Sequence, residues 1–106
     1  MSKPTNKEIL EEVNTQLPKL MKARPELKKA FSGQLVPAAM DAGALDEKHK
    51  ELVALGIAIN AQCDYCIAIH VKKCLETGAT REEIIDVCGV AVMMGGGPSL
   101  MYCNQV

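Results

Sequence analysis

The chain has 106 residues, a length that suits one domain, and we expect residues 1–106 to form a single helical domain. Its 12 Lys and Arg nearly balance its 13 Asp and Glu, and only two Tyr and one Phe are aromatic, which argues against a basic or base-stacking surface for nucleic acid. The apolar runs 52–59 and 87–97 are shorter than the roughly 20 residues that span a bilayer, and the first residues form no apolar secretion signal.

The N-terminal part of the chain predicts two helices. Thr5 and Glu8 fit a capping box that opens the first helix, and Pro18 is expected to end or restart it. Pro25 suits the first turn of a second helix. Pro37 is expected to break or kink that second helix, because proline cannot donate a helical hydrogen bond.

Three further helices follow in the rest of the chain. They cover about residues 47–61, with Asp46 as the cap, then about 64–77 and about 80–94. Because about two residues near Gln62 join the first two of these, they form an antiparallel hairpin. No stretch shows the alternation that is typical of a strand. We therefore predict an all-α fold, a compact domain of about five to six helices built round this hairpin.

Two of these helices are apolar on nearly all sides, over residues 52–59 and 84–94. Such a helix must be covered on all sides, and a chain of this length has little interior with which to cover it. We therefore expect a homo-oligomer in which other copies cover the remaining apolar faces. A monomeric bundle that covers both helices by itself is the alternative.

Cysteine usage points to the cell compartment and to the chemistry. Five cysteines are an odd number, and two of them stand three positions apart. This pattern argues against a secreted disulfide framework and for redox or metal chemistry in a reducing compartment. We therefore expect a cytoplasmic protein that binds neither membranes nor nucleic acid.

The segment N-A-Q-C-D-Y-C-I-A-I-H contains Cys63 and Cys66 as a C-x-x-C pair, with His70 four residues later. If the helix begins near residue 64, Cys63 lies at its N-terminus, where the helix dipole favours a thiolate. Cys66 and His70 are then i,i+4 neighbours on one face. Because histidine titrates near neutral pH, His70 can take a proton from a thiol or return it.

A carboxylate and a phenol are expected near this pair. Folding the hairpin at its turn brings Glu51 within about one helical turn of His70. Glu51 can then accept a hydrogen bond from one ring nitrogen, which leaves the other nitrogen for a thiol or a bridging water. Glu51, His70 and a thiol would form a proton relay for a nucleophilic cysteine. Tyr65, between the cysteines, is a further candidate site residue that either supplies a hydroxyl or simply packs.

Simpler structural explanations exist for single residues. Glu51 alone suits a solvated helix carboxylate, and His70 alone suits a partly buried histidine. The remaining thiols are expected to be inert small apolar side chains: Cys74, Cys88 and Cys103. Cys103 is alternatively an exposed thiol in the tail of the chain.

A zinc site is a weaker alternative. A C-x-x-C pair is half of many zinc sites, but the chain has no second such pair. The ligands would have to be Cys63, Cys66 and His70, with Cys74 as a candidate for a fourth. We expect neither a metal nor another cofactor.

The spacing of Glu51, Cys63, Cys66 and His70, E-x11-C-x-x-C-x-x-x-H, resembles the active-site motif of the alkylhydroperoxidase-D-like branch of the carboxymuconolactone decarboxylase family. The segments E-L-V-A-L-G-I-A-I, G-A-T-R-E-E-I-I-D-V and M-M-G-G-G-P also resemble that family, so the likeness covers about residues 41–102. It implies an all-helical fold and a homo-oligomer, a trimer or a hexamer built as a trimer of dimers. It also implies reduction of peroxides by the cysteine pair.

The same resemblance implies a role for each motif residue. The second cysteine, Cys66, corresponds to the peroxidatic thiol and the first, Cys63, to the resolving thiol. Glu51 and His70 correspond to the proton relay. The best-studied members carry a further histidine between the cysteines, where this chain has Tyr65.

The expected function is therefore a thiol peroxidase, with a peroxide as substrate and a dithiol or a protein as reductant. Cys66 would attack the peroxide and form a sulfenic acid, which Cys63 would condense into a disulfide. A general protein dithiol–disulfide oxidoreductase is the main alternative. An enzyme like the carboxymuconolactone decarboxylases ranks lower, because those members lack the cysteine pair. A redox or metal sensor is a further alternative.

Overall fold

The structure, a computed structural model, describes residues 3–106. All its regular elements are helical, and residues 3–106 contain no strand, so the predicted all-α fold is confirmed. The elements in chain order are α1 (Asn6–Ala23), α2 (Pro25–Ala30), the π-helix η1 (Phe31–Leu35), α3 (Val36–Met40), α4 (Glu47–Asn60), α5 (Asp64–Glu76), α6 (Arg81–Gly95), α7 (Gly97–Tyr102) and the 3₁₀-helix η2 (Cys103–Gln105).

Helix α1 opens as predicted but ends later than predicted. The side chain of Thr5 accepts a hydrogen bond from the backbone N–H of Glu8, and the Glu8 side chain bonds back to Thr5. The helix then runs through Pro18 to Ala23, so the predicted end or restart at Pro18 is wrong. This proline removes only one backbone donor, and the carbonyl that it leaves, on the exposed residue Asn14, can turn to water.

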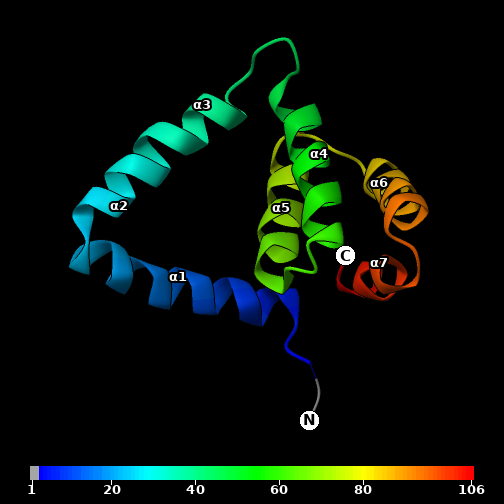
Figure 1. The fold of residues 1–106 in the computed structure, drawn as a ribbon, viewed down its shortest axis with the longest axis horizontal. Coiled ribbons are helices and arrows are strands. Elements are labelled where there is room, and N and C mark those ends of the chain that lie inside the picture. Colours follow the sequence, from blue (N-terminus) through cyan, green and yellow to red (C-terminus); the bar gives the residue numbers. More distant parts are fainter. Residues whose placement is uncertain (1–2) are drawn as a thin grey trace.

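The elements α2, η1 and α3 follow one another without a gap and form one bent helical rod, which we call the arm (residues 25–40). The predicted distortion at Pro37 is present as the wide π-helical turn that precedes it. Such a turn is expected there, because proline has no N–H for the carbonyl of Gly33. In Figure 1 the arm extends away from the other helices and returns to α4 through residues 41–46.

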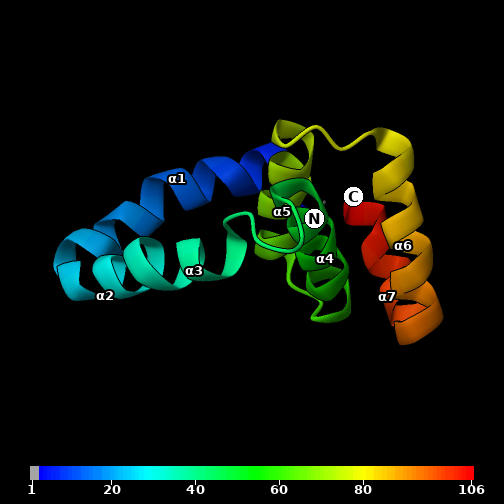
Figure 2. The ribbon, with the colours of Figure 1, turned by 90° about the horizontal axis from the view of Figure 1, so that it is seen from above.

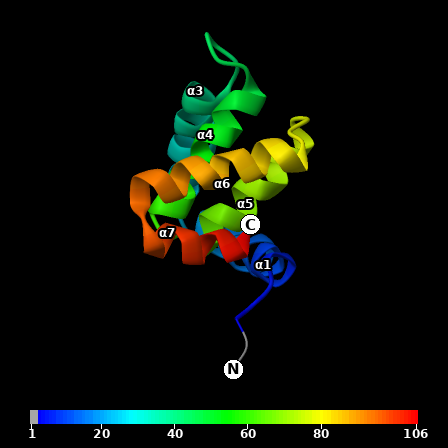
Figure 3. The same cartoon turned by 90° about the vertical axis from the view of Figure 1, so that its right-hand side faces the viewer.

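Helices α4 and α5 form the predicted antiparallel hairpin. Asp46 caps α4, and the turn contains Gln62, the only described residue other than glycine with a positive φ, at 55°. Figure 2 shows α1 and the arm on one side of this hairpin, and α6 with α7 on the other. Figure 3 shows α6 and α7 in front of α4 and α5. The hairpin is thus the middle layer of the molecule.

The core lies between α4, α5 and α6. Its buried side chains include Leu55 and Ile59 of α4, Ile67 and Cys74 of α5, and Ile84 of α6. Many large apolar side chains outside this core are about half exposed or more, on the arm and on the outer faces of α4 and α6. One copy therefore leaves apolar helix faces uncovered, as the sequence predicted, while assembly of copies stays a prediction.

A tight turn joins α6 to α7 and fixes the end of α4. Gly96 has φ 73°, which glycine adopts without strain. The buried Ser99 donates a short hydrogen bond to Asn60, and a Cβ at Gly95 would collide with both side chains. This packing holds the last residue of α4 in place, three positions before Cys63.

Within the described chain, no helix has both the length and the apolar character needed to cross a membrane.

Candidate active site

The C-x-x-C pair lies at the beginning of α5, as predicted. Cys63 is the N-cap residue, and its Sγ accepts a hydrogen bond from the backbone N–H of Cys66 at 3.1 Å. The two sulfur atoms are joined in a disulfide, and the Cα atoms lie 5.2 Å apart, inside the usual range for such bridges. Both cysteines are half-buried. The local helix geometry therefore brings the two sulfurs together without help from another element.

The hydrogen bond predicted between Glu51 and His70 is present. Nδ1 of His70 lies 2.7 Å from Oε1 of Glu51, across the α4–α5 hairpin. The Glu51 side chain is 9% exposed and that of His70 is 25% exposed, so water screens the pair only in part. Because a carboxylate only accepts, Nδ1 donates, and Nε2 remains free to accept a proton. His70 is one helical turn after Cys66, on the same face of α5.

Tyr65 contacts a residue that the sequence did not single out. Its hydroxyl donates to Oε1 of Glu12 on α1 at 2.9 Å, and this bond to a carboxylate raises the pKa of Tyr65. The phenol therefore connects α1 to the first turn of α5, and its hydroxyl proton points to Glu12 and not to a cysteine sulfur. No sequence pattern connects residues 53 positions apart on different helices, so Glu12 could not have been found from the sequence.

The other three cysteines lie outside the disulfide. Cys74 is fully buried, and burial, with a smaller effect of the Glu51 charge, raises its pKa to about 11. Burial and the neighbouring Cys103 thiol raise the pKa of Cys88 to about 11. The Sγ of Cys103 lies 3.9 Å from the carbonyl oxygen of Cys88. Cys74 and Cys88 are therefore protonated thiols at neutral pH, which agrees with the expectation that they are inert.

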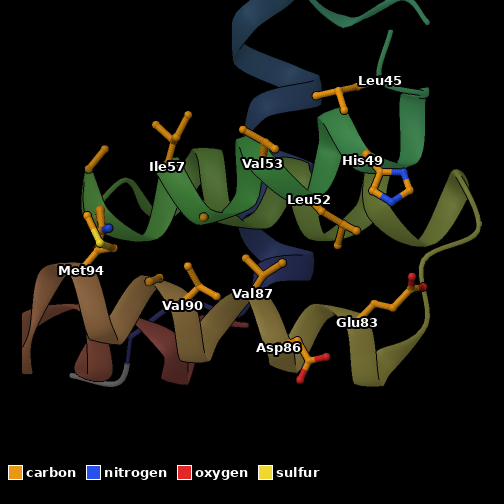
Figure 4. A pocket seen from close by; sticks show the side chains of 14 residues that line it. Leu45, His49, Leu52, Val53, Ile57, Glu83, Asp86, Val87, Val90 and Met94 are labelled. Atoms are coloured by element: carbon orange, nitrogen blue, oxygen red, sulfur yellow. The ribbon is translucent and has the colours of Figure 1, made fainter.

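Two further features bear on the chemistry of the site. Within residues 3–106, no cluster of three or more His, Cys, Asp or Glu side chains is placed to hold a metal ion. A groove of about 780 Å³ lies between α4 and α6 (Figure 4) and is lined by none of the residues Glu51, Cys63, Cys66 and His70. The groove therefore does not belong to the cysteine site.

The fold and the site define a class of protein: an all-helical chain with a C-x-x-C pair at a helix N-terminus and a partly buried Glu–His pair beside it. A model of the carboxymuconolactone decarboxylase family matches residues 25–106. This chain belongs to the carboxymuconolactone decarboxylase family.

Related proteins extend this result. An uncharacterized protein of Cupriavidus necator is 38% identical over 96 residues, which cover 91% of this chain and 84% of that protein. The crystal structure of apo-lpg0406, a carboxymuconolactone decarboxylase family protein from Legionella pneumophila, is 46% identical, with a TM-score of 0.90 over 94% of this chain and 88% of the other. TM1620 from Thermotoga maritima is 32% identical, with a TM-score of 0.67 over 74% and 81%, and its description suggests a role in an antioxidative response.

Proposed function

We propose that the protein is a thiol-dependent peroxidase of the alkylhydroperoxidase-D-like branch, which reduces hydrogen peroxide or organic hydroperoxides. The observation that carries this proposal is the arrangement of the partly buried Glu51–His70 hydrogen bond one helical turn from a cysteine pair that can close into a disulfide. The antioxidative role suggested for TM1620 supports this proposal. The decarboxylase members of the family that the sequence resembles lack the cysteine pair, and its presence here favours thiol chemistry over decarboxylation.

The proposed cycle has three balanced steps. His70 accepts the thiol proton of Cys66, and the thiolate attacks the terminal peroxide oxygen. The O–O bond breaks and Cys66 becomes a sulfenic acid, while the leaving alkoxide or hydroxide takes the proton from His70 and departs as an alcohol or as water. The Cys63 thiol then attacks the sulfenic sulfur, which forms the disulfide and releases water. A dithiol reductant finally exchanges with the disulfide and returns both cysteines to thiols.

The family resemblance and the helix geometry assign the attacking thiol differently. The resemblance makes Cys66 the attacker. The N-cap position favours Cys63, because the backbone N–H of Cys66 points at its sulfur and would stabilise a thiolate there. We assign the attack to Cys66 on the family resemblance, with His70, one helical turn later, as the base that takes the thiol proton.

A trapping experiment tests the function and the assignment together. Turnover is measured with hydrogen peroxide or cumene hydroperoxide and a dithiol. For trapping, the reduced protein is freed of dithiol and treated with the same peroxide and a sulfenate-specific dione. We expect peroxide consumption by the native protein, a trapped sulfenate on Cys66 in Cys63→Ser, and none in Cys66→Ser. Cys74→Ser is the matched control and should react like the native protein. A sulfenate on Cys63 in Cys66→Ser would reverse the two roles.

A general protein dithiol–disulfide oxidoreductase is the second candidate, and the N–H bond to Cys63 favours it. A stabilised thiolate on the first cysteine of a C-x-x-C pair suits attack on disulfides of other proteins. Reduction of a model protein disulfide without peroxide consumption would move this candidate ahead of the peroxidase.

A further inference from the structure

The two residues between the cysteines, Asp64 and Tyr65, are both held by the N-terminal part of the chain. The hydroxyl of Tyr65 donates to Glu12 of α1. Oδ1 of Asp64 lies 3.2 Å from Nζ of Lys3, in the segment before α1. In Figure 1 the beginning of α1 lies beneath the first turn of α5. Both contacts come from residues before position 25, outside the part of the chain that the family model matches.

The carboxylate of Asp64 has no hydrogen bond to balance its inner oxygen. Oδ1 is shielded from water and accepts no hydrogen bond from residues 3–106, although the side chain as a whole is 35% exposed. The ammonium of Lys3 is close enough for an ion pair, but its direction does not suit a hydrogen bond, so the attraction is that of two charges. A charge that is shielded from water and lacks hydrogen bonds needs an opposite charge nearby.

Contacts with the C-terminal end of the chain fix Lys3 beside Asp64. The Lys3 ammonium lies 4.9 Å from the centre of the Tyr102 ring, in a cation–π contact. Three residues later, Asn6 and Gln105 form two hydrogen bonds of 2.6 Å each, one donated by each side-chain amide. The segment before α1 is therefore held between the cysteine turn and the end of the chain, although the Lys3 side chain is itself about half exposed.

A thiolate at Cys63 and the carboxylate of Asp64 are neighbouring anions at one helix N-terminus. The positive end of α5 stabilises both, and the negative charge of Asp64 makes ionisation of the Cys63 thiol less favourable. The element η2, which also packs against α5, carries no charged side chain. The other titratable side chains near this turn, from α1, α4 and α5, already bond one another: Glu12 with Tyr65, and Glu51 with His70. Lys3 is therefore the group that balances Asp64.

We propose that Lys3 belongs to the cysteine site, where its ammonium offsets the carboxylate of Asp64 and so stabilises the thiolate of Cys63. In the resolving step this thiolate attacks the sulfenic sulfur of Cys66, the S–O bond breaks, and the leaving hydroxide takes the proton that the thiol released and departs as water. A larger thiolate fraction speeds this attack near neutral pH. The consequence for resolution rests on the proposed peroxidase function, whereas the effect on the ionisation of Cys63 does not.

The test measures the ionisation of Cys63 without peroxide, so its result does not depend on peroxidase activity. The background is reduced Cys66→Ser, in which alkylation of the Cys63 peptide by iodoacetamide is followed by mass spectrometry between about pH 5 and pH 10. Lys3→Met keeps an unbranched stem to pack on Tyr102 and should raise the apparent pKa of Cys63 by about 0.5, a shift that suits a partly exposed ion pair. Alkylation near pH 7 should then slow about threefold. High salt should remove most of this difference.

Three comparisons separate this role from a structural one. Lys3→Arg keeps the charge and should keep the pKa of the background. Lys7→Met removes the same charge from an exposed position in the first turn of α1 and should change the pKa far less. Asp64→Asn should lower the pKa of Cys63, and Lys3→Met should then add little, because Lys3 acts through Asp64. Far-UV circular dichroism checks the fold of each variant.

Four outcomes would overturn the proposal. The first is an unchanged pKa of Cys63 in Lys3→Met, and the second is an equal rise in Lys7→Met. The third is a rise in Lys3→Arg as large as in Lys3→Met, which would make the shape of the side chain and not its charge responsible. The fourth is a full effect of Lys3→Met in the chain that already carries Asp64→Asn.

Discussion

Replacing Glu51 with Gln tests whether the buried carboxylate and His70 act on the cysteines as one unit. Glu51 accepts the Nδ1 hydrogen bond of His70 at 2.7 Å, and its side chain is 9% exposed. A glutamine has nearly the same shape but no charge, so the imidazolium that forms when His70 takes the thiol proton loses its counter-charge. The change therefore acts on the charged intermediate and not on the packing.

The size of the effect follows from this geometry. A hydrogen bond to a charged group contributes about 1.5–3 kcal/mol, and the low exposure of Glu51 places the pair well within this range. About 2 kcal/mol corresponds to about a 30-fold lower rate of thiol oxidation at neutral pH. His70→Gln removes the base itself and should cost about 100-fold or more. The double variant should lose little more than His70→Gln alone, because residues that act as a unit are not additive.

The assay is stopped-flow oxidation of the reduced protein by peroxide, together with thiolate absorbance near 240 nm against pH. Glu51→Gln should also raise the apparent pKa of the attacking thiol. The chain supplies a matched control in its other histidine: His49 bonds Asp46 at 2.6 Å, but that pair is more than half exposed and lies apart from the cysteines. His49→Gln should keep the native rate. If Glu51→Gln keeps both rate and thiol pKa, or if His49→Gln costs as much, the relay is wrong.

Three further predictions concern the rest of the chain. Under mild oxidation, peptide mass mapping should find the bridge between Cys63 and Cys66, with Cys74 and Cys88 reduced, because a pKa of about 11 leaves about one thiolate in 10⁴ at pH 7. Tyr65→Phe should keep the peroxidase rate within about threefold, since its hydroxyl bonds Glu12 and not a sulfur; a loss of about 100-fold would make Tyr65 an acid–base group. The hydrogen bond from Lys48 lowers the pKa of Glu83 below its usual 4.5, so the pair stabilises the fold above that pH, and its contribution to stability is lost as pH falls through the lowered pKa. The free energy of unfolding of Lys48→Met, measured in urea, should therefore depend less on pH between 6 and 3 than that of the native protein.

The sequence by itself determined the parts of the protein that local physics controls. Capping at Thr5 and Asp46 and the break near Gln62 gave the helix boundaries within a few residues, because these signals act over three or four positions. The Cys63–Cys66 pair was placed correctly for the same reason, since both cysteines lie in one turn of α5. The Glu51–His70 bond was within reach of prediction because a short turn leaves an antiparallel hairpin little choice of register.

Contacts between distant elements were decided only by the tertiary structure. The bond from Tyr65 to Glu12 depends on where α1 packs, and the continuation of α1 through Pro18 depends on solvent that satisfies the freed carbonyl. The sequence indicated that apolar faces exceed what one copy covers. It did not show that these faces divide into a groove on one side of the hairpin and an arm on the other. Hydrophobic periodicity records which face of a helix is apolar, whereas the packing of whole helices in space decides what that face can meet.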